Sequence, residues 1–148
     1  MITKIHPDLM VFIGDYEDAS NEDLLDDYAI DKIINLSQRI ISYSKYYELL
    51  FINIEDHEYE NISKYFDETY EFIESTKNGF CFIHCMGGYS RSVTIAIAYI
   101  MKKLNKTYNE AYLEMKKERK SIGPNRGFVT QLKEYEIYLK NYSYNYLK

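Results

Sequence analysis

The sequence predicts an α/β or α+β fold, in which helices pack on a central sheet. Two observations support this prediction. Short apolar runs typical of buried strands come first along the chain, and apolar stripes at helical spacing dominate the second half. The run at residues 80–84 is continuously apolar and follows a glycine, which is typical of a strand buried on both faces of a sheet.

Four segments are predicted as strands because each is a short, mainly apolar run. They span residues 9–13, 32–36, 49–54 and 80–84. Between the first two, residues 20–23 resemble a helix start, and Leu24, Leu25 and Tyr28 provide a short apolar face.

The remaining helices are predicted from caps and apolar stripes. Asn61 is expected to cap a helix that residues 78–79 end. Its stripe consists of Ile62, Tyr65, Phe66, Tyr70 and Ile73. A helix from Ser92 carries a strong stripe made of Val93, Ile97, Ile100, Met101 and Leu104.

Two further helices complete the second half of the chain. Residues 107–110 form a capping box that opens the first of them. Asn125, after a proline, can cap the last, whose stripe is Phe128, Leu132, Tyr135 and Leu139. The tyrosine-rich tail at residues 142–146 is expected to be a half-buried or frayed helix end.

The bulk properties limit the function. A chain of 148 residues fits a single domain over residues 1–148. The net charge of −5 argues against partners such as nucleic acids or anionic membranes, since both need a basic surface. The first residues hold no apolar signal core, and two cysteines are too few for a disulfide scaffold. We therefore expect a cytoplasmic protein, with the nucleus as a further compartment; the oligomeric state is not indicated.

The segment Cys85–Arg91 has the layout of an anion-binding loop. A buried strand leads into Met86, Gly87, Gly88, Tyr89 and Ser90, and a helix follows. In such a layout backbone N–H groups converge, and the helix N-terminus adds positive potential. Arg91 offers two parallel donors to a phosphate, and the same field should favour the thiolate of Cys85 over the thiol. A packed core cysteine is the alternative for Cys85, and it is the preferred interpretation for Cys81.

The string His84-Cys85-x-x-Gly88-x-Ser90-Arg91-Ser92-x-Thr94 resembles the signature of cysteine-dependent dual-specificity protein phosphatases, especially the small atypical members. Segments 10–19, 33–37, 52–66 and 118–136 are also similar to the family and follow its order, so the resemblance covers roughly residues 9–139. Gly87 departs from the alanine of many members. The resemblance implies the cysteine-phosphatase fold, a central mixed, mostly parallel sheet flanked by helices.

The catalytic assignments combine chemistry with this resemblance. Cys85 would form a phosphocysteine intermediate, while Arg91 and the N–H groups of residues 86–91 hold the phosphoryl oxygens. The residues alone leave the general acid open between Asp56 and its acidic neighbours, which are Glu55, Glu58 and Glu60. The resemblance points to Asp56. Without it, Asp56 could equally belong to a solvated loop.

Other residues are expected to support the loop. Ser92 could donate a hydrogen bond to the leaving sulfur, as the family implies. His84 and Asn125 would hold the loop backbone in place. Asn125 could also be only a helix cap, and Tyr89 could either point into the mouth of the pocket or pack against the protein. Three scattered histidines and two cysteines make a poor zinc set, so neither metal nor cofactor is expected.

The predicted function is a protein phosphatase that acts on phosphotyrosine and on phosphoserine or phosphothreonine of phosphorylated protein substrates. One alternative is a phosphatase for phosphoinositides or other phosphate esters, although the loop lacks the lysines that phosphoinositide enzymes tend to carry. Another is a non-catalytic module that binds phosphorylated residues. Low-molecular-weight phosphatases usually carry such a loop near the N-terminus, and rhodaneses lack the closing arginine in this form.

Overall fold

The sheet has five strands in the order β1-β2-β5-β3-β4. The computed structural model describes residues 1–147 and the side chains of residues 1–142. The outer strand β1 (Thr3–Lys4) pairs antiparallel with β2 (Val11–Gly14). All other pairs, which join β2, β5 (Phe80–His84), β3 (Ile30–Asn35) and β4 (Glu48–Phe51), are parallel. The mixed, mostly parallel sheet expected from the sequence is confirmed.

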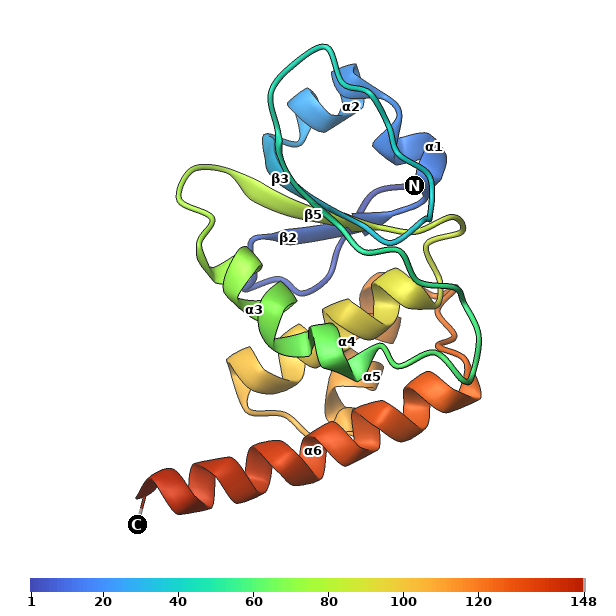
Figure 1. Ribbon diagram of the computed structural model, residues 1–148. Helices are drawn as coiled ribbons and strands as arrows, with labels where there is room; N and C mark the ends of the chain where they lie inside the picture. Colours follow the sequence, from blue (N-terminus) through green and yellow to red (C-terminus); the bar gives the residue numbers. More distant parts are fainter. Residues whose placement is uncertain (148) are drawn as a thin grey trace.

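Helices cover both faces of the sheet (Figure 1). The short helices α1 (Tyr16–Ala19) and α2 (Glu22–Asp27) lie on one face. The other face carries α3 (Phe66–Glu74), α4 (Arg91–Leu104), α5 (Tyr108–Glu118) and α6 (Arg126–Leu147). The two hydrophobic cores follow this division, and the larger one lies under α3–α6.

The central strand β5 separates these cores by side-chain alternation. Phe82 packs in the smaller core toward α1 and α2, whereas Cys81 and Ile83 pack in the larger one. Helix α4 is buried along residues 91–101 because it lies between the sheet and the outer helices. The strand β5 and the helix α4 are therefore both largely buried, and the loop between them is held at both ends.

Several predicted boundaries shift in the structure. The strand predicted at 49–54 ends at Phe51, whereas the strand at 80–84 is confirmed as predicted. Strand β1 and helix α1 were not predicted, because two and four residues are too few to show a periodic pattern. Asn21 caps α2 by accepting a hydrogen bond from the Leu24 N–H. Within residues 1–147, no helix combines the length and apolar character that crossing a membrane requires.

The prediction that Asn61 caps the third helix is wrong. A 3-10 turn, η1 (Ser63–Tyr65), precedes α3, and the side-chain Oδ1 of Asn61 accepts a hydrogen bond from the Ser63 hydroxyl instead of from a helix N–H. Nor does the pair at residues 78–79 end the helix, which stops at Glu74. Gly79, with φ at +90°, forms the turn into β5, where a side chain would meet the Ala29 carbonyl. The tyrosine-rich tail at residues 142–146 belongs to α6, which continues to Leu147. The burial expected for this tail lies outside the described side chains beyond Tyr142.

The capping box at the start of α5 is confirmed. The Thr107 hydroxyl accepts a hydrogen bond from the Glu110 N–H at 3.1 Å, and the Glu110 carboxylate accepts one from the Thr107 N–H at 2.9 Å. Thr107→Ala should lower the free energy of unfolding by about 1 kcal/mol, because a helix N–H loses its acceptor. Urea unfolding measures this change. Thr107→Ser should keep most of the stability, and equal losses in both variants would contradict the capping role.

Candidate active site

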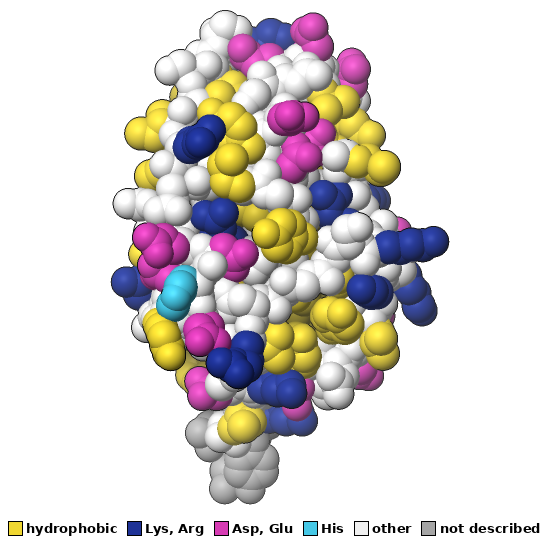
Figure 2. Space-filling view, turned by 90° about the vertical axis from the view of Figure 1, so that its right-hand side faces the viewer, with side chains coloured by type: hydrophobic (Ala, Val, Ile, Leu, Met, Phe, Trp, Pro, Cys, Tyr) yellow, Lys and Arg dark blue, Asp and Glu magenta, His cyan; other side chains and the backbone are white. Residues whose placement is uncertain are grey.

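The segment predicted to bind an anion lies where the parallel strands end. Strand β5 leads into residues 85–90, and α4 begins at Arg91 (Figure 1). Ligands of open α/β sheets bind outside the carboxyl ends of the strands. Acidic, basic and hydrophobic side chains are interspersed on the face seen in Figure 2, without a continuous basic surface. Any strong attraction for an anion on this side must come from local groups.

The loop carbonyls are hydrogen-bonded to donors outside the cradle that the loop forms. These pairs are Met86 O with Tyr16 N at 3.1 Å, Gly88 O with Arg119 Nε at 3.0 Å, Tyr89 O with Gly123 N at 2.8 Å, and Ser90 O with Thr94 N at 2.9 Å. In a trans peptide the N–H of the next residue points opposite to the carbonyl, and the chain has no cis peptide among its described residues. The following N–H groups, at residues 87, 89, 90 and 91, are therefore turned toward the other side.

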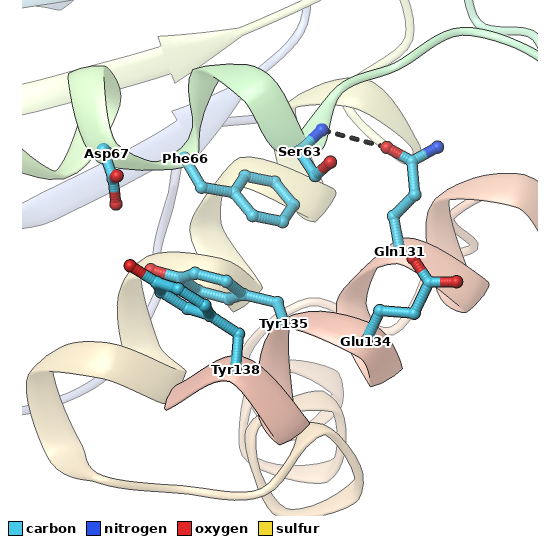
Figure 3. Close-up of a pocket in the computed structure, with 7 residues that line it drawn as sticks. All are labelled: Ser63, Phe66, Asp67, Gln131, Glu134, Tyr135 and Tyr138. Atoms are coloured by element: carbon cyan, nitrogen blue, oxygen red, sulfur yellow. Dashed lines mark hydrogen bonds between the residues drawn. The ribbon is translucent and has the colours of Figure 1, made fainter. Parts of the chain in front are cut away.

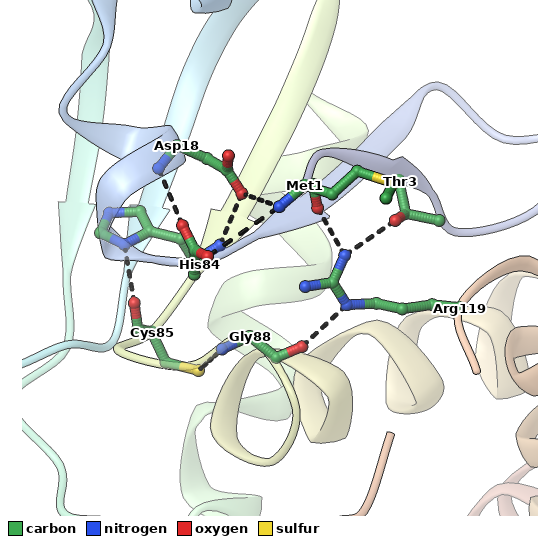
Figure 4. Close-up of polar contacts among 8 residues, drawn as sticks. Met1, Thr3, Asp18, His84, Cys85, Gly88 and Arg119 are labelled. Carbon is green, nitrogen blue, oxygen red and sulfur yellow. Dashed lines mark hydrogen bonds and ion pairs between the residues drawn. The ribbon is translucent and has the colours of Figure 1, made fainter. Parts of the chain in front are cut away.

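The Cys85 sulfur lies at the floor of this cradle. The Gly88 N–H donates to Cys85 Sγ at 3.3 Å (Figure 4), and Ser92 Oγ lies 3.2 Å from the same sulfur. The side chain is 2 % exposed. The structure thus brings together Cys85, the loop N–H groups and the hydroxyl that the sequence placed near the sulfur.

Gly88 must be glycine at this position. Its φ is +72°, a region that side chains rarely adopt. A Cβ would also lie 2.8 Å from both the Arg119 guanidinium and the Gly14 carbonyl oxygen. The loop can therefore pass this close to Gly14, at the end of β2, only because residue 88 has no side chain.

The Arg91 side chain is buried and fixed at one nitrogen. Nη1 donates to the carbonyl oxygens of Leu36 at 2.9 Å and Ile54 at 3.0 Å. These carbonyls follow β3 and β4, so the sheet itself orients the guanidinium. The buried Nε has no hydrogen-bond partner among the described residues. A buried donor without a hydrogen-bond partner costs free energy, and a bound phosphoryl oxygen would provide the missing acceptor for Nε.

Asp56 is the acidic side chain that reaches the loop. Its Oδ1 accepts hydrogen bonds from Ser90 Oγ at 2.7 Å and from Asn125 Nδ2 at 2.9 Å. The Asn125 N–H donates in turn to Ser90 Oγ at 3.1 Å. These three residues come from three separate segments and hold the Asp56 carboxyl group beside the cradle.

The competing carboxylates make other contacts. Glu58 forms an ion pair with Arg126 at 2.9 Å, and Glu60 Oε1 accepts a weak hydrogen bond from the Glu55 N–H at 3.5 Å. The end of this acidic segment is anchored on α6, beside a pocket between α3 and α6 (Figure 3). There Gln131 accepts from the Ser63 N–H at 2.9 Å and donates to the Glu60 carbonyl at 2.8 Å. Among the four carboxylates, only Asp56 is hydrogen-bonded to the loop within the described residues.

His84 is buried directly behind the loop. Burial lowers the pKa of its imidazole to about 4, despite the hydrogen bond to the Cys85 carbonyl and the nearby Asp18 carboxylate, which act in the opposite direction. The ring is therefore neutral near pH 7. Its Nδ1 lies 3.3 Å from the Cys85 carbonyl oxygen and, with the proton on that nitrogen, donates to it (Figure 4).

The structure adds detail to the places of Asn125 and Tyr89. Asn125 contacts the Ser90 hydroxyl and Asp56, not the loop backbone, and it also accepts from the Phe128 N–H as a helix cap. Tyr89 is 51 % exposed at the rim of the loop. Its ring lies over Gly87, where a Cβ would come within 2.4 Å of the ring. Alanine at position 87 would therefore require the Tyr89 ring to move.

Sequence reasoning missed Tyr16, Gly123 and Arg119, which bind the loop carbonyls. Gly123 and Arg119 lie inside the segment 118–136 that resembles the family, but nothing local marks them as loop contacts. Tyr16 lies in the unpredicted helix α1. Within the described residues, no group of three or more His, Cys, Asp or Glu side chains is placed to hold a metal ion.

Comparison with known proteins identifies the family. A family model described as the dual specificity phosphatase catalytic domain matches residues 11–138. The chain belongs to the dual specificity phosphatase family. The match covers the acidic segment, the anion loop and the start of α6, and it agrees with the resemblance found in the sequence.

Curated relatives extend this result to named dual specificity phosphatases. A probable dual specificity protein phosphatase of Dictyostelium discoideum is 40% identical over 141 residues, which cover 94% of this chain and 35% of the relative. Dual specificity protein phosphatase 7 of Homo sapiens is 34% identical over 131 residues, which cover 85% of this chain and 31% of the relative. The chain therefore spans about a third of the length of these relatives.

Solved structures of dual specificity phosphatases and related proteins share the fold. A human tyrosine phosphatase-like serine/threonine/tyrosine-interacting protein is 32% identical with a TM-score of 0.85, over 93% of this chain and 97% of that one. A mouse putative dual specificity phosphatase, solved with zinc tungstate, is 25% identical with a TM-score of 0.88, over 96% of this chain and 90% of that one. The dual specificity phosphatase fold thus extends over nearly the whole chain.

Proposed function

We propose that this chain is a protein phosphatase that hydrolyses phosphotyrosine and phosphoserine or phosphothreonine in protein substrates. One observation carries the proposal. The loop carbonyls are bonded outward, so that backbone N–H groups converge above Cys85 Sγ, while Ser90 holds Asp56 beside them. A nucleophile, an anion cradle and a proton donor are the three parts that hydrolysis of a phosphate ester needs. Family membership and the names of the relatives support the same activity.

In the first step, the Cys85 thiolate attacks the phosphorus atom. The S–P bond forms as the P–O bond of the ester breaks, and Asp56 donates its proton to the leaving oxygen. The loop N–H groups and the Arg91 guanidinium stabilise the negative charge on the three equatorial oxygens. Asp56 Oδ2 has no hydrogen-bond partner among the described residues, which leaves this oxygen available for the proton.

In the second step, water attacks the phosphocysteine. Asp56, now ionised, takes a proton from the water as the O–P bond forms and the S–P bond breaks. The electrons of the broken bond return to sulfur, where Ser92 Oγ at 3.2 Å can donate a hydrogen bond to the departing thiolate. Inorganic phosphate leaves, and because the proton taken from the water stays on Asp56, the enzyme regains both its protonated acid and its thiolate.

A non-catalytic module that binds phosphorylated residues is the second candidate. One human protein of the same fold is named as phosphatase-like and as an interacting protein. That name is the reason to test a binding function here. Against it, the chain retains Cys85, Arg91 and Asp56, which a binding module does not require together. Action on phosphoinositides has less support, because no lysine lies between Cys85 and Arg91.

Activity on a panel of phosphopeptides and phosphoinositides tests the proposal. We expect release of phosphate from peptides carrying phosphotyrosine or phosphothreonine, inhibition by vanadate, and no loss of activity with EDTA, because the proposed chemistry uses only side chains and backbone N–H groups. Colorimetric detection of phosphate gives the rates. Loss of activity with EDTA would point to a metal-dependent phosphatase, and binding of phosphopeptides without turnover would favour the module.

A further inference from the structure

Arg119, at the end of α5, places its guanidinium behind the anion loop. Its Nε donates to the Gly88 carbonyl at 3.0 Å, while the N–H of the same Gly88 donates to Cys85 Sγ at 3.3 Å (Figure 4). A single residue of the loop therefore connects the sulfur on its inner side to Arg119 on its outer side.

The guanidinium is also fixed on its far side. Its Nη1 donates to Thr3 Oγ1 at 2.8 Å and to the Met1 carbonyl, so Arg119 joins the loop to the segment around β1 (Figure 4). Nη2 lies so close to Gly88 that a Cβ there would come within 2.8 Å of it. The planar guanidinium fork is held at several atoms, which reduces the rotamer freedom that a long side chain otherwise keeps.

Arg119 differs from the other donors that hold the loop carbonyls. Those of Met86, Tyr89 and Ser90 accept from backbone N–H groups, and His84 is neutral near pH 7 because burial lowers its pKa to about 4. Arg119 is the charged donor in this set. A hydrogen bond from a charged donor polarises the peptide it binds, so the Tyr89 N–H at the other end of that peptide becomes a stronger donor.

An empty anion cradle is under electrostatic stress. N–H groups that point toward a common centre carry like partial charges and repel one another until an anion binds. The outward hydrogen bonds oppose this repulsion, because a peptide that turned its N–H away would also lose its carbonyl partner. The Gly88–Tyr89 peptide resists this rotation through a charge-assisted bond that the other loop peptides lack.

We propose that Arg119 is a positioning residue for oxyanion binding: it holds the Gly88 carbonyl outward and thereby directs the Tyr89 N–H toward the phosphoryl group. The effect of this role on turnover rests on the proposed phosphatase function, whereas its effect on oxyanion binding does not. Arg119 need not touch the substrate, because it acts through the peptide between Gly88 and Tyr89.

Tungstate is the probe, because it is a tetrahedral oxyanion. Its dissociation constant is measured directly by calorimetry, and its inhibition constant is measured in aryl phosphate hydrolysis, both well below the unfolding temperature. Arg119→Ala should weaken tungstate binding about tenfold, the scale of losing one charge-assisted hydrogen bond. Arg119→Lys should restore part of the affinity, since a lysine keeps a charged donor. Thr3→Val, which removes an anchor of the guanidinium, should cause a smaller loss.

Lys117→Ala is the matched control, since it removes one exposed positive charge from the same end of α5. It should leave tungstate affinity unchanged. Equal losses of tungstate affinity in Lys117→Ala and Arg119→Ala would show that the effect comes from net charge alone and would overturn the proposal. A lower unfolding temperature in Arg119→Ala and Thr3→Val with unchanged tungstate affinity would leave Arg119 a purely structural role and overturn the proposal.

The binding measurement is independent of turnover. If the wild type binds tungstate but releases no phosphate from any substrate, the proposed phosphatase function fails while the Arg119 variants still decide the positioning role. If the wild type is active and Arg119→Ala keeps the wild-type tungstate affinity, the positioning role fails while the phosphatase function stands. An active Arg119→Ala with weakened tungstate binding and a higher KM supports both.

Discussion

Cys85→Ser is expected to reduce hydrolysis of a small aryl phosphate by at least about 10⁴-fold, the scale of losing a catalytic nucleophile. The serine hydroxyl is not ionised near neutral pH and has no base beside it, because His84 faces the carbonyl of residue 85 and not its side chain. The loop N–H groups and the Arg91 guanidinium do not depend on the sulfur. Tungstate binding should therefore persist in the variant, as calorimetry can show.

Cys81→Ala provides the matched control for the nucleophile. Cys81 lies four positions earlier on β5, is fully buried in the larger core, and burial raises the pKa of its thiol well above the usual range. Its removal should cost stability through a small cavity but leave turnover of the folded protein near the wild-type rate. If a folded Cys81→Ala lost activity, or Cys85→Ser retained it, the assignment of Cys85 would be wrong.

Asp56→Asn is expected to lower kcat by about 10²- to 10³-fold, because the leaving oxygen no longer receives a proton. The wild-type rate should fall as pH rises, since only the protonated carboxyl group can act as the acid. Asparagine has no such proton to lose, so the alkaline limb of the pH–rate profile should disappear. Aryl phosphates with more basic leaving groups should show the larger loss, because they depend more on protonation.

Glu55→Gln is the control for this prediction, because it neutralises the adjacent carboxylate while keeping its shape. It should retain both the rate and the alkaline limb of the profile. A wild-type profile in Asp56→Asn, or loss of the alkaline limb in Glu55→Gln, would move the acid assignment to another residue. Steady-state kinetics across the pH range with two leaving groups makes this comparison.

The sequence predicted the elements that have a regular apolar pattern. Strand β5 and the capping box of α5 match their predictions, because a continuous apolar run and a reciprocal pair of caps are local signals. Asn61 was predicted wrongly since a 3-10 turn intervenes, which the apolar stripe does not reveal. The elements β1 and α1 are too short to produce any pattern.

The site was predictable only in part for a related reason. The loop from Cys85 to Arg91 is contiguous, so its chemistry can be inferred from one short string. The contact between Ser90 and Asp56 joins residues 34 positions apart, and it depends on where the sheet places the end of β4. The residues alone therefore left several acids open, and the family resemblance pointed to Asp56. Arg119 also lies in a segment that resembles the family, but the resemblance did not indicate its contact with the Gly88 carbonyl.

The strand order also constrains how the chain can fold. Strand β5 lies between β2 and β3 in the sheet but follows β4 in the chain. During synthesis, the edges of β2 and β3 that later pair with β5 therefore stay unpaired until residues 80–84 emerge. The sheet cannot form strand by strand in chain order. Non-local parallel pairing of this kind slows folding and exposes edges to aggregation. The pairing of β5 between β2 and β3 also positions the loop that begins at Cys85. Recovery of activity during refolding should therefore report the formation of this central pairing.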